Sequence, residues 1–281
     1  MSTVLVPTDG SPAAEQAIGH AVTIAGQMDG TVHGLYAVHL TPNADYDLGI
    51  ESPTVQEAEE QRGKAAIDTI ERHCEAAGVD FEGHLRDGAP AEMITTVAGE
   101  IDPDVIAIGT HGGSKLTRPL LGSTTVEVLR QGAHPVLAVP DESTVPTGGY
   151  ETLLVATDGS QGSREAENTA FEWAETFDAS IEGLYVVESG LSDTAAIEEA
   201  LEADGERAVE DLQARAQEAG LATATAVETG VPHTVINEHA NERDADLIVL
   251  GARGRGTLER TVLGSVTERT VRTADRAVLV V

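Results

Sequence analysis

The sequence predicts an α/β protein built from two tandem doubly wound domains, each with a mostly parallel sheet flanked by helices. Short aliphatic and β-branched runs alternate with helical stretches, and this whole pattern occurs twice along the 281 residues. Such alternation is typical of parallel sheets whose connecting helices cover both faces. Hydrophobic residues make up 41% of the chain and aromatic residues only 3%. The core must therefore be aliphatic, as buried parallel strands usually are.

The chain contains an internal duplication. Thr3–Ser11 and Thr152–Ser160 are identical at seven of nine positions, and Asp104–Arg130 matches Asp246–Arg272 at 11 of 27. The offset between the copies falls from 149 to 142 residues after the second strand, where the first copy has a longer loop. A segment rich in Pro, Gly and Thr separates the copies and is typical of a linker. We expect three parts: domain 1 at residues 1–140 (copy 1), a linker at 141–150, and domain 2 at 151–281 (copy 2).

The elements of copy 1 follow from its periodicity. Strands are expected at Thr3–Thr8, Val32–His39, Phe81–Arg86, Val105–Gly109 and Val136–Val139. Helices are expected at Ser11–Met28, Val55–Ala77, Pro90–Gly99 and Ser123–Gln131. The first helix begins with a serine cap followed by a first-turn proline, and the second ends near a glycine. Copy 2 repeats this order.

Each copy carries a glycine-rich loop after its fourth strand. Both loops follow the pattern G-x2-G-x9-G-S, from Gly109 to Ser123 and from Gly251 to Ser265. A glycine at the end of a strand lets backbone amides approach a ligand closely, and the Gly-Ser pair opens a helix whose amides favour an anion. A plain glycine turn with a serine N-cap is the alternative. The shared spacing favours a phosphate site.

The charges of the chain are distributed unevenly. The net charge is −31, from 48 acids and 17 bases, yet residues 109–130 and 251–276 hold nine of the bases and only four of the acids. A basic cluster beside a glycine loop indicates a polyanionic ligand. The overall charge argues against a nucleic-acid-binding surface, which needs a basic face. It fits the cytoplasm of an extreme halophile, where salt screens self-repulsion, with an ordinary acidic cytosolic protein as the alternative.

Asp9 and Asp158 form a matched pair, each following a first strand in the motif T-D-G-S. Ligands of open parallel sheets bind outside the carboxyl ends of the strands, where strand order reverses. If the first and fourth strands are neighbours there, each Asp faces the glycine loop of its own copy. The carboxylate can then accept hydrogen bonds from ribose or adenine, or help to hold Mg²⁺ on phosphates. An Asp turn that caps the next helix is the alternative.

Several classes of protein are disfavoured. No apolar run approaches the ~18 residues that a membrane span needs, and no signal peptide precedes the first strand, so we expect a soluble cytoplasmic protein. The single cysteine, Cys74, cannot form an internal disulfide, and no Cys/His spacing suggests zinc. His33, His39 and His134 show no ligand spacing, so we expect structural roles and no metal site.

Three motifs of the chain resemble the universal stress protein family in its ATP-binding form. They are the opening V-P-T-D-G-S, the G-x2-G-x9-G-S loop and the closing strand H-P-V-L-A-V. The resemblance covers the chain twice and implies a five-stranded parallel sheet of order 3-2-1-4-5 in each copy. It also implies ATP or AMP, with or without Mg²⁺, at the point where strand order reverses. Pairing through the last strands would make the two copies an internal pseudo-dimer, and a homodimer of two chains is also compatible.

The resemblance implies which residues line each nucleotide site. The adenine end of copy 1 would be lined by Pro7, Thr8, Asp9 and Val38. The ribose and phosphates would contact Gly109, Thr110, His111, Gly112, Gly113, Ser114, Lys115, Gly122, Ser123, Thr124 and Thr125. The matching positions of copy 2 are Ala156, Thr157, Asp158, Val187, Gly251, Ala252, Arg253, Gly254, Arg255, Gly256, Thr257, Gly264, Ser265, Val266 and Thr267. Copy 2 departs from the pattern at Ala156, Arg253 and Arg255, so we expect copy 1 to bind at least as tightly.

The function that we expect is that of a stress-response protein that binds adenine nucleotide and acts through its nucleotide-bound state on a client that the sequence does not identify. The first alternative is an enzyme, either a slow ATPase or a self-phosphorylating protein with Ser123 or Ser265 as the acceptor. The sequence lacks the Walker motif G-x4-G-K-[ST] and a dedicated base beside the loop, so the enzyme is less favoured. A scaffold that binds no ligand is the second alternative, and the intact glycines of both copies argue against it.

Overall fold

The computed structural model of the protein describes residues 2–39, 53–111, 121–146, 148–189, 195–254 and 263–281. The elements of copy 1 are β1 (Thr3–Pro7), α1 (Pro12–Gln27), β2 (Thr31–Val38), α2 (Pro53–Ala77), β3 (Asp80–Asp87), α3 (Pro90–Ile101), β4 (Val105–Gly109), α4 (Ser123–Gln131) and β5 (Val136–Val139). Those of copy 2 are β6 (Thr152–Ala156), α5 (Gln161–Phe177), β7 (Ser180–Glu188), α6 (Ala195–Glu218), β8 (Thr223–Gly230), α7 (Pro232–Glu242), β9 (Leu247–Leu250), α8 (Ser265–Thr273) and β10 (Ala277–Val280).

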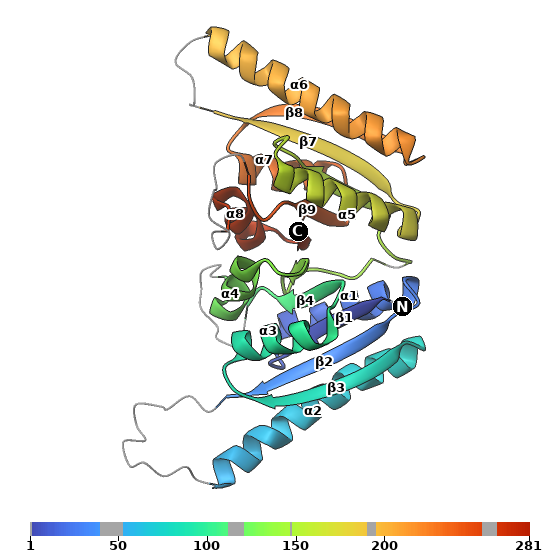
Figure 1. Cartoon of the computed structure of the whole chain (residues 1–281), viewed down its shortest axis with the longest axis vertical. Coiled ribbons are helices and arrows are strands. Elements are labelled where there is room, and N and C mark those ends of the chain that lie inside the picture. The colour runs from blue at the N-terminus through green and yellow to red at the C-terminus, as the bar shows by residue number, and fades with distance from the viewer. Residues whose placement is uncertain (1, 40–52, 112–120, 147, 190–194, 255–262) are drawn as a thin grey trace, which may run out of the picture.

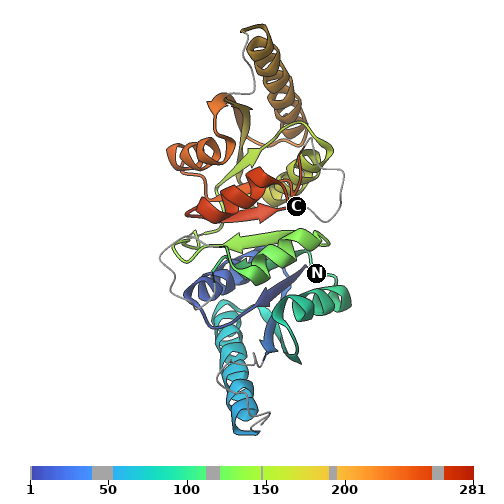
Figure 2. The same cartoon turned by 90° about the vertical axis from the view of Figure 1, so that its left-hand side faces the viewer.

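All ten strands form one continuous sheet, in the order β3-β2-β1-β4-β5-β10-β9-β6-β7-β8. Within each copy the strands are parallel and follow the order 3-2-1-4-5, as predicted. The two copies meet at β5 and β10, which pair antiparallel with Leu137 opposite Leu279. The internal pseudo-dimer is therefore confirmed. The C-terminus lies near the middle of an elongated molecule, and α2 and α6 lie at its two ends (Figures 1 and 2).

The sheet separates two aliphatic cores because successive strand side chains point to opposite faces. In β1, Val4 and Val6 belong to the core that α1, α2, α5 and α6 cover, whereas Leu5 belongs to the core that α3, α4, α7 and α8 cover. Each core runs through both copies, so residues of β5 and β10 share it across the seam. The two halves are therefore packed together as well as hydrogen-bonded.

The described residues of the segment between the copies include two, Ser143 and Tyr150, that are buried against the domains. Tyr150, within the predicted linker, is only 1% exposed, and its ring meets the ring of Phe177 edge-on at 5.0 Å. The Tyr150 hydroxyl lies 2.8 Å from Nδ1 of the buried His20 in α1, and Ser143 Oγ lies 3.0 Å from Nε2 of the same ring. This network connects the linker to copy 1, while the aromatic contacts connect it to α5 of copy 2. Among the described helices, none is long and apolar enough to cross a membrane.

Candidate functional site

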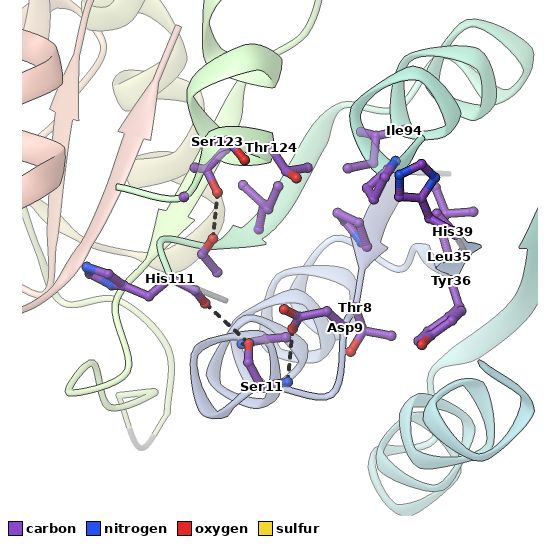
Figure 3. Close-up of a pocket in the computed structure, with 18 of the residues that line it drawn as sticks. Thr8, Asp9, Ser11, Leu35, Tyr36, His39, Ile94, His111, Ser123 and Thr124 are labelled. Carbon is purple, nitrogen blue, oxygen red and sulfur yellow. Dashed lines mark hydrogen bonds between the residues drawn. The ribbon is translucent and has the colours of Figure 1, made fainter. Parts of the chain in front are cut away.

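A cavity of about 420 Å³ opens in copy 1 at the carboxyl ends of the strands. It lies where the order reverses, since β1 pairs with β2 on one side and β4 on the other. Nine residues proposed from the sequence line it: Pro7, Thr8, Asp9, Gly109, His111, Gly122, Ser123, Thr124 and Thr125. Figure 3 shows Ser123 and Thr124 on one side of the hollow, Leu35, Tyr36 and His39 on the other, and Thr8 and Asp9 between them.

Other proposed residues do not line this cavity. Val38 is buried in the sheet, and Thr110 is fully buried. The Thr110 backbone joins two elements, because its N–H donates to Val139 O (2.8 Å) and its carbonyl accepts from Gly122 N–H (2.8 Å). Thr110 therefore holds the start of α4 against the end of the sheet. Gly112 to Lys115 lie outside the described residues.

Asp9 sits in a turn that fixes the direction of its carboxylate. Its Oδ1 accepts a hydrogen bond from the Ser11 N–H at 2.9 Å, and Ser11 Oγ in turn accepts from the Ala14 N–H at 3.3 Å and caps α1. The turn expected as an alternative role for Asp9 is thus present. Asp9 also lines the cavity. One residue therefore shapes the entry to α1 and presents a negative charge to the cleft.

Gly109 is needed because the end of β4 touches the first turn of α1. A β-carbon on Gly109 would lie 2.8 Å from the backbone carbon of Ala13, closer than carbon atoms approach. The equivalent contact recurs in copy 2, where a β-carbon on Gly251 would lie 2.7 Å from the Gly162 carbonyl oxygen. These glycines let the strand end and the helix start form a single narrow floor beneath each cleft.

The start of α4 carries backbone N–H groups with no helical partner. Gly122 is the N-cap residue and offers no side-chain cap, so the serine N-cap expected as an alternative is wrong for Ser123. The first helical bond runs from Val126 N–H to Gly122 O (2.9 Å), which leaves the N–H groups of residues 123–125 at the open end of the helix. Thr125 Oγ1 donates to Gly109 O (2.8 Å) and fixes this end over the strand. A helix start of this kind favours an anion.

The opposite wall of the cleft is largely apolar. Its residues, which the sequence analysis did not assign to the site, include Leu35, Ala37, Pro90, Ile94 and Ile108. Further lining residues that it did not assign are Ser11, Ala14, Tyr36, His39 and Glu59. Burial, together with the hydrogen bond that Tyr36 donates to Glu59 at 2.7 Å, raises the pKa of Tyr36 to about 12. The tyrosine therefore remains a neutral donor at physiological pH.

Copy 2 contains the equivalent cavity, of about 530 Å³. Its lining includes the proposed residues Ala156, Thr157, Asp158, Val187, Gly251, Arg253, Gly254, Gly264, Ser265, Val266 and Thr267. Ala252 is buried away from it, and Arg255 to Thr257 lie outside the described residues. The lining residues not assigned from the sequence are Ser163, Leu184, Tyr185, Val186, Glu188, Leu201, Pro232, Ile236 and Leu250.

The helix start and the aspartate of copy 2 repeat the geometry of copy 1. Gly264 is the N-cap of α8 without a side-chain cap, and Thr267 Oγ1 donates to Gly251 O at 2.8 Å. Asp158 Oδ1 accepts from the Ser160 N–H at 2.9 Å. A β-carbon on Gly254 would overlap Asp158 Oδ2, so the aspartate lies directly against the glycine loop.

Two charged residues distinguish copy 2. Glu167 is 2% exposed, accepts a hydrogen bond from Thr157 Oγ1 at 2.6 Å and pairs with Arg215, whereas copy 1 has the apolar Ile18 at the same offset. Arg253 replaces His111, and its Nη2 would lie 3.2 Å from a β-carbon on Gly132, at the C-terminal end of α4. The Arg253 guanidinium thus reaches toward copy 1 from the wall of the copy 2 cleft.

The repeat carries a sequence signal for part of the apolar wall. Gly34-Leu35-Tyr36 recurs as Gly183-Leu184-Tyr185, and both the leucine and the tyrosine of each copy line a cleft. The wall residues from α3 lack such a signal, because Pro90 and Ile94 read as an ordinary helix start and core position. Their place in the cleft follows only from how α3 packs against β1 and β2.

The sequence and the fold of this chain are similar to those of known proteins. The universal stress protein family model matches residues 1–140 and 149–281. A universal stress protein of Methanocaldococcus jannaschii is 39% identical over 139 residues, covering 47% of this chain and 82% of its own. One from Mycolicibacterium smegmatis is 25% identical over 99% of this chain and 96% of its own. The crystal structure of a universal stress protein from Archaeoglobus fulgidus shares the fold, with 24% identity, a TM-score of 0.75, and coverage of 99% of this chain and 97% of that one.

Proposed function

The chain belongs to the universal stress protein family, and on that basis we propose that it is a stress-response protein that binds an adenine nucleotide, ATP or AMP, in each of its two clefts. In this proposal the protein acts through its nucleotide-bound state and not through turnover. The boundaries of the two nucleotide-binding units would be residues 1–140 and 151–281. Two features of each cleft support this function: the helix start on one side and the apolar residues on the other.

The observation that carries the proposal is the uncapped helix start facing each cleft. At α4 the N–H groups of residues 123–125 have no helical partner, and Gly122 contributes no side chain that would compete with a ligand. Helix N-termini with exposed N–H groups bind phosphate through hydrogen bonds and the helix dipole. The same device occurs at α8. Because the chain has a net charge of −31, two local sites that attract anions support a specific anionic ligand.

The opposite wall supports a base rather than a simple phosphate ion. Leu35, Ile94 and Ile108 are apolar side chains that line a cavity of about 420 Å³. Nucleotide sites combine an apolar surface for the base with a few fixed polar groups. Asp9 lies between the two ends, where a carboxylate can accept hydrogen bonds from ribose hydroxyls. The adenine would then lie near Leu35 and the phosphates near Ser123.

Mg²⁺ is the metal that this donor set would suit. It prefers hard oxygen ligands and usually keeps several water molecules, with one or two carboxylates and the phosphates as its other ligands. We assign this role to Asp9 in copy 1 and Asp158 in copy 2, because each lines a cleft and follows the first strand of its copy, where the strand order reverses. Mg²⁺ bound there would neutralise phosphate charge beside the aspartate.

We expect the two clefts to differ in affinity. In copy 2, the buried Glu167 adds a carboxylate behind Thr157, and Arg253 is directed partly toward copy 1. A carboxylate near the site opposes a polyanion, while an arginine directed toward the other copy is less available to phosphate. Copy 1 should therefore bind at least as tightly as copy 2.

Calorimetric titration with Mg-ATP in molar KCl tests the proposal. Gly122→Val places a branched side chain at the mouth of the α4 helix start and should remove the copy 1 site, while Gly264→Val should remove the copy 2 site. Gly99→Val is the matched control, since a β-carbon on Gly99 in α3 meets no atom within 4 Å. We expect wild type and control to bind alike. Unchanged binding in the Gly122→Val/Gly264→Val double variant would overturn the assignment of both sites.

A further inference from the structure

Two histidines of neighbouring strands meet near the outer edge of the copy 1 half of the sheet. Nδ1 of His33 in β2 lies 2.9 Å from Nε2 of His84 in β3. Glu82 Oε1, also in β3, lies 3.9 Å from the same His84 nitrogen, and one ligand atom from each of the three residues falls within 4.8 Å of the others. From this geometry we propose that His33, Glu82 and His84 bind a divalent transition-metal ion of the zinc type.

The strand register explains why the three side chains converge. His33 is directly opposite Glu82 in the parallel β2–β3 pair, and His84 follows Glu82 by two positions. Residues two apart in a strand point to the same face, so all three side chains project from one side of the sheet. β3 is the edge strand of the sheet on the copy 1 side (Figure 1). The sequence separation of 51 residues between the histidines hid this cluster from arguments based on ligand spacing. The sequence analysis expected a structural role for His33 and no metal site, and the present proposal departs from that expectation.

The distances suit four-coordinate metal binding after a small adjustment. With metal–nitrogen bonds of about 2.0–2.1 Å, two nitrogen ligands of a tetrahedral ion lie about 3.3 Å apart. The histidine nitrogens would separate by a few tenths of an ångström, and the Glu82 oxygen, now 3.9 Å from His84 Nε2, would approach by more than that. Glu82 is exposed, so its side chain has room to move. Three protein ligands leave one position for water or another ligand.

The alternative explanation of the short distance between His33 and His84 is a hydrogen bond between the two imidazoles. Such a bond needs a proton on one of the two facing nitrogens, whereas a metal ion is held when both present lone pairs. The Glu82 carboxylate is what distinguishes the two cases, because it adds a third ligand atom and a negative charge that the imidazole pair does not need. The nearby cation, Arg86, is engaged by Glu100 at 3.3 Å. Two imidazoles with one carboxylate favour zinc, cobalt or nickel ions over magnesium or calcium.

Copy 2 lacks these ligands at the equivalent places, which makes it an internal comparison. Glu182 occupies the His33 position in the repeat, and the β7–β8 register places Ala224 opposite Glu182 and Ala226 two residues further on. The cluster is thus a feature of copy 1 alone. None of its three residues is among the described residues that line either cleft. Metal binding here would be a property separate from nucleotide binding.

The experiment is calorimetric titration of the full chain, free of nucleotide, with ZnCl₂ in molar KCl containing excess Mg²⁺, which occupies nonspecific carboxylate sites. We expect one tight Zn²⁺ per chain, and a cobalt complex with the strong visible absorption of tetrahedral Co²⁺. His33→Ala and His84→Ala should each weaken Zn²⁺ binding by at least the ~10–100-fold that loss of an outer-shell partner causes. His73→Ala, which removes an exposed histidine on α2, is the matched control and should bind as wild type does.

Zn²⁺ should also raise the melting temperature of the wild type and of His73→Ala, but not that of His33→Ala, since a ligand stabilises only the state that binds it. If the buried His84 variant fails to fold, His33→Ala decides the question, because His33 is partly exposed and its loss leaves His84 in place. Equal Zn²⁺ affinity in wild type and His33→Ala would overturn the proposal and assign the binding to surface carboxylates.

Discussion

His20 is a single residue whose protonation affects both copies, because it links α1 to the linker through Tyr150 and Ser143. Burial lowers the pKa of His20 from 6.5 to about 4. His20 therefore stays neutral in the folded state at pH values where the same residue is protonated in the unfolded chain. The contribution of His20 to stability is complete above pH 6.5 and declines as the pH falls toward 4, by about 3 kcal/mol in total.

We predict that His20→Gln lowers the number of protons taken up on unfolding by about one between pH 6.5 and 4. The free energy of unfolding should then depend less steeply on pH in this range. Denaturant titrations at several pH values measure this slope for wild type, His20→Gln and the exposed control His73→Gln. The control should keep the wild-type slope. If His20→Gln also keeps it, the buried imidazole does not resist protonation, and the network around Tyr150 has a different basis.

At the scale of single residues, the sequence identified those cleft residues whose position depends on a local backbone motif. Asp9 and Gly109 were identifiable because a motif places each at a strand end, and both line the cleft. Val38 is buried and does not line the copy 1 cavity, because successive residues of a strand point to opposite faces of the sheet and the sequence does not show which face the cleft occupies. Glu167 went unnoticed because, from sequence, an acid inside a helix is indistinguishable from a solvent-exposed one.

At the scale of elements, β5 and β10 determine how the copies are joined. Each is a short apolar strand that would be an unprotected edge if its copy stood alone, and such edges promote aggregation. The antiparallel pair covers both edges at once. Leu137 and Leu279 lie opposite each other across this seam, and both are fully buried. The seam therefore belongs to the core.

We predict that Leu137→Ala and Leu279→Ala each lower the free energy of unfolding by about 2–5 kcal/mol. Because the two side chains face each other, the double variant should depart from additivity by at least about 0.5 kcal/mol. Val231→Ala, at an exposed position, is the control and should change stability by less than about 0.5 kcal/mol. Strict additivity, with two separate unfolding transitions, would mean that the copies fold independently of the seam.

The elements themselves were largely predictable. Val105–Gly109, Ser123–Gln131 and Val136–Val139 have the predicted bounds, because glycines or prolines flank each of these segments. The first helix begins after Ser11, which caps it as expected. What the sequence left open was register, which depends on contacts between distant strands. The meeting of His33 with His84 follows from the β2–β3 register, and no local pattern reports it.

At the scale of the whole molecule, the net charge of −31 opposes compaction. We predict that stability rises steeply with salt, because the Debye length falls from ~30 Å at 0.01 M to ~3 Å at 1 M ionic strength. Circular dichroism melts in KCl from 0.01 to 2 M measure this effect, with sucrose at matched viscosity as the control. A melting temperature independent of KCl would show that the surface acids do not repel one another appreciably in the folded state.

The architecture of the whole molecule also determines how the two clefts are arranged. One continuous sheet holds two clefts that repeat the same aspartate, strand-end glycine and uncapped helix start. The strands between the two clefts, β4, β5, β10 and β9, are hydrogen-bonded neighbours. Under the proposed function, two nucleotide sites in one continuous sheet would suit a protein that acts through its nucleotide-bound state.

The most direct test is a crystal structure of the chain grown with Mg-ATP in molar KCl. We predict nucleotide in the copy 1 cleft, with phosphate oxygens about 3 Å from the N–H groups of residues 123–125, a hydrogen-bond distance. The adenine should lie against Leu35 and Ile94, and the ribose near Asp9. Empty clefts at saturating nucleotide, or a nucleotide bound with its phosphates away from the start of α4, would contradict the account.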